Sequence, residues 1–428
     1  MTTSSGVLGL VMARDEWPLL GVSVTHALVT HVDHVLVLDH ASEDGTAAGL
    51  EALGRRFPGR LTVLRSPDGA YHQEAATSLL LEVAHASRYD WVHVFDADEL
   101  LLSPPDRSMA DVLADVDPDV DVVRYDIQNW VAPSDFDDTD LASYARLRHR
   151  SVPEPSLATA RYPSDVQGPV EDGLLSFFDL PFPSKVIIRG DRVRWLSAGA
   201  HLVRWPEVVR ETRLAPGALR CAHLPFLSQR RLALKVAQGR ALEASGLPPE
   251  HGWQNRMLHR MAEAGTLADF WQRHSVPEQG VDDRDGGPRL VEDGALALAL
   301  APTLSLLTDR TATDTAAAAA VSATQSVPTA AAVRSIRTAQ LGWEAVVADL
   351  GRVIGDQQRL RALVETLTAE RDALAKESSR RRVRLRRMRA EREALRAQRD
   401  ELAARVEELS ASRVDRARRT IGRRRLRP

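Results

Sequence analysis

Trp91-Val92-His93-Val94-Phe95-Asp96-Ala97-Asp98-Glu99-Leu100-Leu101-Leu102 is the stretch on which the predicted fold depends. It begins as a continuous apolar run, which is typical of a strand buried on both faces of a parallel sheet. Three carboxylates then interrupt the run, and burying an unpaired charge in a core costs several kcal/mol or more. We therefore expect these carboxylates just past the carboxyl end of the strand, where open α/β sheets bind ligands. In an extended chain Asp96 and Asp98 would point to the same side and could together hold a divalent cation.

The sequence before this stretch alternates between apolar runs and helix-like segments. Strands are expected at 6–13, 32–39 and 61–65, and helices at 19–29, 47–56 and 73–87. Short connections between alternating elements predict an α/β fold with a mostly parallel, doubly wound sheet whose strand ends share one edge. That edge would collect Arg14, Asp39 and the two aspartates. No glycine-rich phosphate loop follows the first run, which disfavours dinucleotide-binding and P-loop folds.

Three motifs in this region occur in a fixed order. They read V-M-A-R-D-E at 11–16, V-L-V-L-D-H-A-S-E-D-G-T at 35–46 and W-V-H-V-F-D-A-D-E-L-L at 91–101. Together they resemble the family 2 glycosyltransferases with the GT-A fold, in the branch whose last motif carries D-x-D-E, over about residues 6–240. The resemblance implies transfer of a sugar from a nucleotide-sugar donor to an acceptor hydroxyl, with Mg²⁺ or Mn²⁺ and usually with inversion.

The resemblance also assigns roles to residues at the strand ends. Asp98 would bind the metal and Asp96 would face the ribose or a metal-bound water, with a plain capping turn as the alternative. Glu99 would support these two carboxylates. Asp39 would contact the nucleotide base and Arg14 would border its pocket, unless they are an ordinary helix-entry acid and a surface ion pair. Gln73 lies where the related branch also has a glutamine at a helix start, so we expect it to contact the donor.

The third metal ligand and the catalytic base are expected further along the chain. We favour His201 as a metal ligand, because the small residues before it let the backbone approach closely. His223 and Lys235 are placed near the diphosphate, since they match an H-x4-S-x6-K run of the related branch; a structural role for either histidine stays open. Asp172, in an irregular segment at 131–182, is the candidate general base, with a solvated loop carboxylate as the alternative.

Length and composition predict several domains in a chain of 428 residues. We expect a catalytic domain at 1–275, a flexible linker at 276–338, a coiled coil at 339–412 and a basic tail at 413–428. The single cysteine, Cys221, excludes an intramolecular disulfide, and we see no secretory signal, so a cytoplasmic location is expected. Only three of the 56 basic residues are lysine, which we attribute to genomic composition.

The carboxyl-terminal part has its own pattern. Mostly apolar residues recur every seven positions from Val353 to Leu409, which predicts a coiled coil, most simply a parallel homodimer, with a solvated single helix as the alternative. From Arg380 to Pro428 the chain has 19 arginines and 7 acidic residues. Because this segment has no aromatic residue, base-reading nucleic-acid binding is disfavoured. We expect contact with an anionic membrane surface at the inner face of the cell membrane, where each basic residue contributes about 1 kcal/mol.

These observations predict a metal-dependent glycosyltransferase with a GT-A domain, acting on a glycan or lipid-linked acceptor in bacterial surface glycan synthesis. The alternative is a catalytically inactive coiled-coil scaffold or membrane-anchoring protein that binds a nucleotide-sugar.

Overall fold

The structure is a computed structural model of the chain. It describes residues 6–65, 77, 80–85, 89–160, 163–193, 196, 201, 210–244, 252–277, 287–309, 392–393, 395–396, 398–410 and 413. The chain divides into two units, residues 1–342 and 343–428, and each is described by itself.

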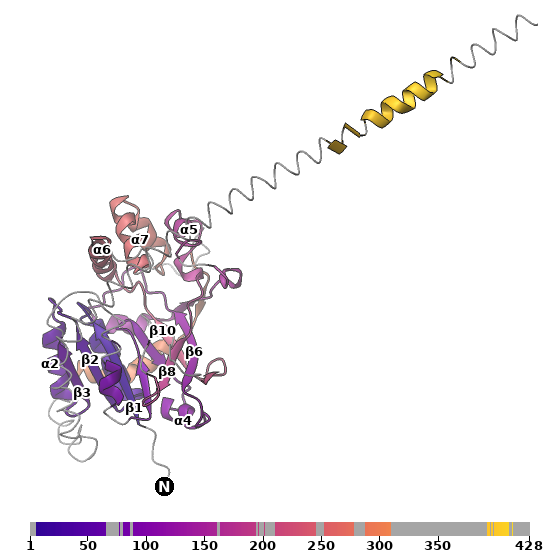
Figure 1. Cartoon of the computed structure of the whole chain (residues 1–428). Helices are drawn as coiled ribbons and strands as arrows, with labels where there is room; N and C mark the ends of the chain where they lie inside the picture. Colours follow the sequence, from indigo (N-terminus) through magenta and orange to yellow (C-terminus); the bar gives the residue numbers. More distant parts are fainter. Residues whose placement is uncertain are drawn as a thin grey trace, which may run out of the picture. The chain divides into compact units, whose positions relative to one another are not determined.

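One half of the main sheet is the parallel arrangement that the sequence predicts. Its strands are β1 (Val7–Ala13), β2 (His34–Asp39), β3 (Leu61–Arg65) and β4 (Trp91–Val94). They pair in parallel in the order β3-β2-β1-β4, and helices α1 (Leu19–Thr30) and α2 (Thr46–Arg56) follow β1 and β2 (Figure 1). Strands β1, β2 and β4 are almost wholly buried, as expected for apolar strands covered on both faces.

The other half of the sheet is mixed. It continues from β4 through β8 (Lys185–Arg189), β6 (Val122–Asn129), β10 (Arg220–His223) and β5 (Glu99–Leu102), and β9 (Glu211–Arg213) pairs with β6. Strand β8 runs antiparallel to both β4 and β6, whereas β10 runs parallel to β6 and antiparallel to β5. Nine of the described strands thus form one sheet, and only part of it is doubly wound.

This topology brings several strand ends to one edge. The carboxyl ends of β4, β6 and β10 meet there, with His223 opposite Asn129 on one side and Glu99 on the other. Because β8 is antiparallel, its first residue, Lys185, lies at the same edge. Polar side chains that are far apart in the sequence therefore converge there.

A helical layer lies beside that edge (Figure 1). It contains α5 (Gln167–Glu171), α6 (Gln229–Ala244), α7 (Trp253–Glu263) and α8 (Leu267–Arg273). These helices enclose an aromatic core that includes Phe177, Phe226 and Phe270. Other elements in the described part of this unit include α4 (Met109–Ala114), β7 (His149–Ser151), β11 (Leu290–Glu292), α9 (Ala295–Thr308) and the 3-10 helices η1 (Leu141–Arg146), η2 (Pro155–Leu157) and η3 (Phe177–Asp179).

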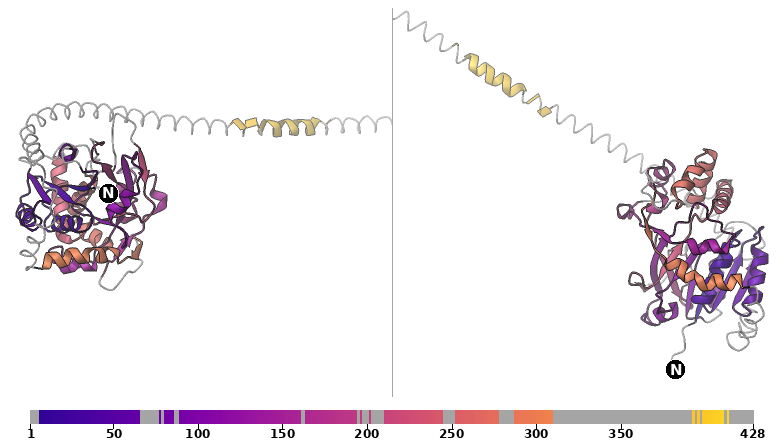
Figure 2. Two further views of the ribbon diagram at one scale, coloured as in Figure 1. Left: turned by 90° about the horizontal axis from the view of Figure 1, so that it is seen from below. Right: turned by 180° about the vertical axis from the view of Figure 1, so that it is seen from behind.

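Residues 287–309 differ from the sequence prediction, which placed them in a flexible linker. Strand β11 pairs with β7, and α9 packs against α1, where Figure 2 shows it as the orange helix. Leu296 and Leu300 are fully buried, and the Thr303 hydroxyl lies 3.3 Å from Nδ1 of His26. The linker prediction is wrong for these residues, because leucines four positions apart give the alanine-rich segment one apolar helix face. Residues 310–338 lie outside the described residues.

In the second unit the described residues between 392 and 413 are helical. Leu395, Leu402, Val406 and Leu409 are 58–66% exposed, and they occupy the heptad positions of the sequence pattern. The rest of the predicted coiled coil lies outside the described residues. None of the helices in the described part of the chain has the length and hydrophobicity needed to cross a membrane.

Candidate active site

The D-A-D-E segment is a tight turn between β4 and β5. The Glu99 backbone N–H donates to the Asp96 carbonyl at 3.1 Å, and the Asp96 N–H donates to Oε2 of Glu99, also at 3.1 Å. The sequence prediction that both aspartates point to one side holds only for an extended chain. In the turn they instead contact two different lysines, because residues 96–98 are not part of either strand.

Lys185 is a buried cation that the sequence reasoning did not single out. Its Nζ lies 2.7 Å from Oε2 of Glu99 and 3.3 Å from Oδ2 of Asp96, and its side chain is 0% exposed. Burial lowers the pKa of Lys185, but the two carboxylates outweigh burial and raise it above its usual value. Burial raises the pKa of Glu99 to about 8, against the effect of the lysine. Glu99 thus holds the turn through the Asp96 N–H, and Lys185 lies between Glu99 and the Asp96 carboxylate.

Asp98 faces His223 and Lys235. Lys235 Nζ lies 3.0 Å from Oδ2 of Asp98, and Nε2 of His223 lies 3.9 Å from the same oxygen. Burial would raise the pKa of the Asp98 carboxyl, but Lys235 and His223 bring it below its usual value. Asp98 is therefore ionised at neutral pH, although its side chain is only 14% exposed.

The tautomer of His223 follows from its neighbour. Its Nδ1 lies 2.7 Å from Oδ1 of Asn129, and an amide oxygen can only accept, so Nδ1 donates. Burial lowers the pKa of His223 to about 4 in spite of Asp98, so the ring is neutral at pH 7. The lone pair of Nε2 is then directed at the Asp98 side of the ring, as in a metal-binding histidine whose other nitrogen is held by a hydrogen bond.

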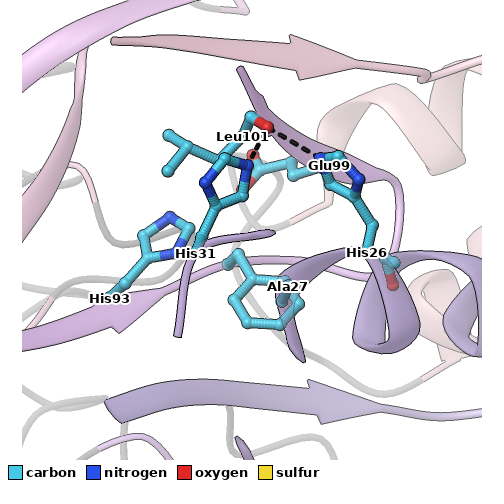
Figure 3. A pocket seen from close by; sticks show the side chains of 8 residues that line it. His26, Ala27, His31, His93, Glu99 and Leu101 are labelled. Atoms are coloured by element: carbon cyan, nitrogen blue, oxygen red, sulfur yellow. Dashed lines mark hydrogen bonds between the residues drawn. The ribbon is translucent and has the colours of Figure 1, made fainter. Parts of the chain in front are cut away.

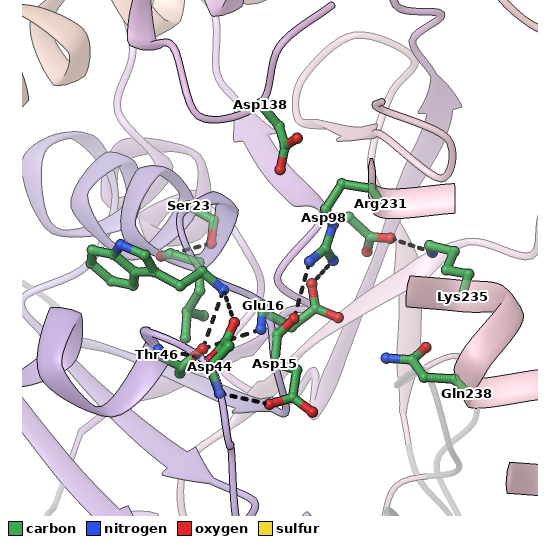
Figure 4. A network of polar contacts seen from close by, with 12 residues as sticks. Asp15, Glu16, Ser23, Asp44, Thr46, Asp98, Asp138, Arg231, Lys235 and Gln238 are labelled. Atoms are coloured by element: carbon green, nitrogen blue, oxygen red, sulfur yellow. Dashed lines mark hydrogen bonds and ion pairs between the residues drawn. The ribbon is translucent and has the colours of Figure 1, made fainter. Parts of the chain in front are cut away.

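Helix α6 is tied to the loops at the strand ends, which positions Lys235 (Figure 4). Nη1 of Arg231 donates to the Asp15 carbonyl at 3.2 Å, and its guanidinium also pairs with Glu16. In the turn before the helix, the Ser228 hydroxyl donates to Oδ1 of Asp138 at 2.6 Å. Lys235 lies one helical turn beyond Arg231, on the side that faces Asp98.

His201 lies in the same electrostatic neighbourhood. Its Nδ1 is 3.3 Å from the Ser184 carbonyl oxygen. Burial, together with Lys185, lowers the pKa of His201 to about 4, although Asp96 opposes this. His201 is thus a neutral imidazole near Lys185 and Asp96, whereas the histidine placed against Asp98 is His223.

The loops that follow β1 and β2 form the other side of the edge. Oδ1 of Asp39 accepts from the Ser42 N–H at 3.1 Å, and the Asp15 N–H donates to the Ser42 hydroxyl at 3.0 Å. Nε of Arg14 lies 3.6 Å from Oδ2 of Asp15, and the Arg14 side chain is 40% exposed. Ser42 therefore joins the two loops, and Asp39 holds the Ser42 backbone in place. Gln73 lies outside the described residues.

Asp172, the candidate base, is the residue that ends α5. Its backbone N–H donates to the Gly168 carbonyl at 2.9 Å. The neighbouring Glu171 pairs with Arg260 of α7 at 2.9 Å. The structure thus places Asp172 in the helical layer.

A very small pocket beside Glu99 is lined by three histidines, His26, His31 and His93 (Figure 3). Nε2 of His26 and Nε2 of His31 both lie within hydrogen-bond distance of the Leu101 carbonyl oxygen, at 2.8 and 2.6 Å. Burial lowers the pKa of His26 to about 4 and that of His93 to about 3. These rings are neutral. The contacts of His26 and His31 with the Leu101 carbonyl hold β5 in place beside the turn without adding charge there.

The residues fit a divalent cation that is bound together with phosphate oxygens. Among the described residues no three His, Cys, Asp or Glu side chains gather closely enough to hold a metal alone. Asp98 and His223 supply two donors, and Mg²⁺-type sites often use one or two protein ligands and complete their shell with substrate phosphates and water. The nitrogen donor suits Mn²⁺ better than Mg²⁺. The Lys235 ammonium lies beside the same carboxylate. Because an ammonium and a metal cation repel each other, anionic oxygens of the ligand must lie between them.

Comparisons with known proteins yield no family. No model of a known protein family matches the chain, and no curated protein sequence matches it. Similar solved structures include TarS 1–349 of S. aureus, with 16% identity, 63% of this chain and 71% of that chain covered and a TM-score of 0.29. Glucosyl-3-phosphoglycerate synthase from Mycobacterium tuberculosis, in complex with phosphoglyceric acid, has 18% identity, 29% and 44% coverage and a TM-score of 0.20. A mycobacterial protein has 20% identity, 29% and 41% coverage and a TM-score of 0.21. The chain spans less than half of the last two, and TM-scores this low establish neither a shared fold nor an activity.

Proposed function

We propose that the chain is a metal-dependent glycosyltransferase that moves a sugar from a nucleotide-sugar donor to an acceptor hydroxyl. The observation that supports this most directly is that two lone-pair donors lie close together, the Asp98 carboxylate and Nε2 of His223 at 3.9 Å, beside Lys235. Two donors and one ammonium at the carboxyl ends of strands suit a cation and a diphosphate together. In this proposal His223 replaces His201 as the protein's nitrogen ligand for Mn²⁺ or Mg²⁺.

The chain's own residues would divide the work as follows. Asp98 and His223 would hold the cation, which when bound would neutralise charge on the diphosphate as it leaves. Lys235 would face the phosphate oxygens. Lys185 would neutralise Asp96 and hold Glu99, so that the turn keeps its shape beside a charged ligand. Asp39 and Arg14 would border the nucleotide, and Asp172 would take the proton from the acceptor hydroxyl.

The carboxyl-terminal part supports a proposal about location and assembly. Leu395, Leu402 and Leu409 recur every seven residues and are exposed on an isolated helix, so a second copy of the chain could cover them in a parallel homodimer. The arginine-rich tail would hold the enzyme at an anionic membrane surface, near lipid-linked glycan acceptors of surface glycan synthesis. Flotation of the chain with anionic liposomes, and its loss after removal of residues 413–428, tests the membrane contact.

The proposed activity is tested by hydrolysis of UDP-, GDP- and dTDP-sugars with and without Mn²⁺. We expect metal-dependent release of the nucleoside diphosphate from at least one donor, and loss of that release in Asp98→Asn. Donor binding without turnover would favour the inactive nucleotide-sugar-binding scaffold. Neither binding nor hydrolysis of any donor would refute the enzyme proposal.

The assignment of the nitrogen ligand is tested with two alanine variants. His223→Ala should raise the Mn²⁺ concentration needed for half-maximal hydrolysis, whereas His201→Ala should leave it near the wild-type value. The reverse result would return the metal to His201. Asp172→Asn should slow transfer to an acceptor and leave binding of the donor unchanged; equal transfer rates would exclude Asp172 as the base.

A further inference from the structure

Three glycines surround the indole of Trp17, at the end of the loop that follows β1. A Cβ on Gly49 of α2 would lie 2.4 Å from three atoms of the indole, and a Cβ on Gly21 of α1 would lie 2.8 Å from it. A Cβ on Gly45, the residue before α2, would lie 3.4 Å from the same ring. Real Cβ atoms essentially never come within 3.0 Å of such atoms, so Gly21 and Gly49 leave space that the indole occupies.

The indole sets the distance between α1 and α2. Trp17 is partly buried and packs against the apolar core that includes Leu20 of α1 and Leu50 of α2. Gly21 and Gly49 are buried positions of the same two helices. Glycine weakens a helix interior relative to alanine, because it loses more conformational freedom on folding. Two glycines at these positions therefore indicate a contact that a methyl group would prevent, and we call the indole between them the wedge.

The backbone of Trp17 joins the wedge to two further elements. The Trp17 N–H lies 3.2 Å from Oδ2 of Asp44 and 3.2 Å from Oγ1 of Thr46, at the start of α2. Thr46 is fully buried. The Trp17 carbonyl accepts from Nη2 of Arg230 at 3.1 Å, in the first turn of α6. Trp17 thus holds the beginnings of α1, α2 and α6 together.

The loops on either side of the wedge have unusual backbone conformations. Asp15 and Ala41 have positive φ angles of 56° and 54°. Residues other than glycine rarely adopt such angles, which persist only where the surrounding structure holds them. The two loops are bonded to each other, since Oδ1 of Asp15 accepts from the Asp44 N–H at 3.3 Å (Figure 4). The same loops contain Arg14 and Asp39, the two residues proposed above to border the nucleotide.

We propose that Trp17 is a positioning residue for the nucleotide, because its indole holds α1 and α2 at the distance at which loops 14–17 and 39–46 keep these conformations. The proposal rests on the function proposed above. Trp17 acts on the ligand only through the two loops, by way of Asp44 and Thr46. Asp98 and His223 lie on other elements, so a change at the wedge should weaken nucleotide binding and leave the metal requirement unchanged.

The test compares Gly49→Ala with Gly54→Ala, a matched control in the same helix. A Cβ on Gly54 would have no described atom within 4 Å, so its methyl group does not disturb the wedge. Trp17→Leu and the double variant Trp17→Leu/Gly49→Ala complete the set. The measurements are the urea midpoint, the dissociation constant of the matching nucleoside monophosphate (UMP, GMP or dTMP), and the donor KM, kcat and Mn²⁺ requirement of hydrolysis.

Gly49→Ala should lower the urea midpoint, because the new methyl group and the indole cannot both occupy the present space. It should raise the monophosphate dissociation constant and the donor KM by the same factor, about three- to tenfold, as for the loss of about one hydrogen bond to the nucleotide. The kcat and the Mn²⁺ requirement should stay unchanged. Gly54→Ala should keep wild-type binding and an equal or higher midpoint, because alanine is the better helix former.

In the double variant the loss of midpoint should be smaller than the sum of the two single losses, because leucine leaves room for the methyl group. Additive losses, or equal behaviour of Gly49→Ala and Gly54→Ala, would overturn the wedge. A lowered Gly49→Ala midpoint with an unchanged monophosphate dissociation constant would make Trp17 a purely structural residue and overturn the positioning role. A wild-type chain that binds no nucleotide refutes the proposed function and this role with it, whereas the other outcomes all require wild-type binding.

Discussion

Replacement of Lys185 by methionine tests whether the D-A-D-E turn depends on its buried counter-ion. The variant keeps the volume of the side chain but removes the ammonium that lies 2.7 Å from Glu99 and 3.3 Å from Asp96. Removing one partner of a buried ion pair costs about 3–5 kcal/mol, because the other charge stays buried without compensation. With a pKa of about 8, Glu99 is already mostly protonated at pH 7, so the charge left without compensation in the variant is mainly that of Asp96, whose side chain is partly exposed. We therefore expect a loss near the lower value, about 3 kcal/mol, at pH 7.

The assay is urea unfolding at 25 °C, with the free energy of unfolding taken from the midpoint and slope. Above pH 8, where wild type has released the Glu99 proton, the gap between wild type and variant should widen by up to about 1.4 kcal/mol per pH unit. This follows because the folded variant keeps a proton on Glu99 that the unfolded chain releases, so its stability falls as pH rises.

Two further variants make the result interpretable. At pH 9, addition of Glu99→Gln to Lys185→Met should recover part of the loss, because glutamine can still accept from the Asp96 N–H and carries no charge at any pH. Arg55→Met breaks an exposed ion pair with Glu51, both side chains being more than 60% exposed, and should leave the midpoint unchanged. A Lys185→Met midpoint equal to wild type, or losses that simply add in the double variant, would refute the counter-ion argument.

Three other predictions concern the site and the domain limits. Asn129→Leu should weaken Mn²⁺ binding about 10- to 100-fold, measured by metal titration of donor hydrolysis, because Nδ1 of His223 loses the acceptor that sets its tautomer; an unchanged titration would contradict this. Acidification from pH 6.5 toward 4 should lower the urea midpoint. The folded-state pKa values of about 4 for His26 and about 3 for His93 lie below the unfolded value of 6.5, so the unfolded chain binds more protons in this range. A constant midpoint would show that these rings are not buried and neutral. A chain that ends at residue 309 should unfold at the same urea midpoint as the catalytic domain of the full chain. A chain that ends at residue 275 should unfold at a lower midpoint, because it lacks α9, which covers α1. Equal midpoints for the two truncated chains would mean that α9 is dispensable for stability.

The first half of the sheet could be predicted from sequence because its order is local. Strand β3 and helix α2 lie within one residue of the expected limits, since each apolar run is followed directly by the helix that packs beside it. The order and direction of the strands in the second half could not be predicted in this way. Its strands β5, β8, β6 and β10 are neighbours in the sheet but lie far apart in the chain, and β10 is a strand of only four residues. A four-residue strand carries too little pattern to be recognised before its partners are known.

The candidate active site was likewise predictable from the sequence only in part. The sequence by itself determined that Asp96, Asp98 and Glu99 follow a buried strand, because three carboxylates cannot remain unpaired in a core. Only the tertiary structure decided their partners: β8 runs antiparallel and brings Lys185 to the same edge, and β10 and α6 bring His223 and Lys235 to Asp98. The sequence did contain one indication of these partners: Lys185 and Lys235 are two of only three lysines in an arginine-rich chain. Pairing of charges across a sheet depends on strand order and direction, and these are set by packing of distant segments rather than by the residues next to each carboxylate.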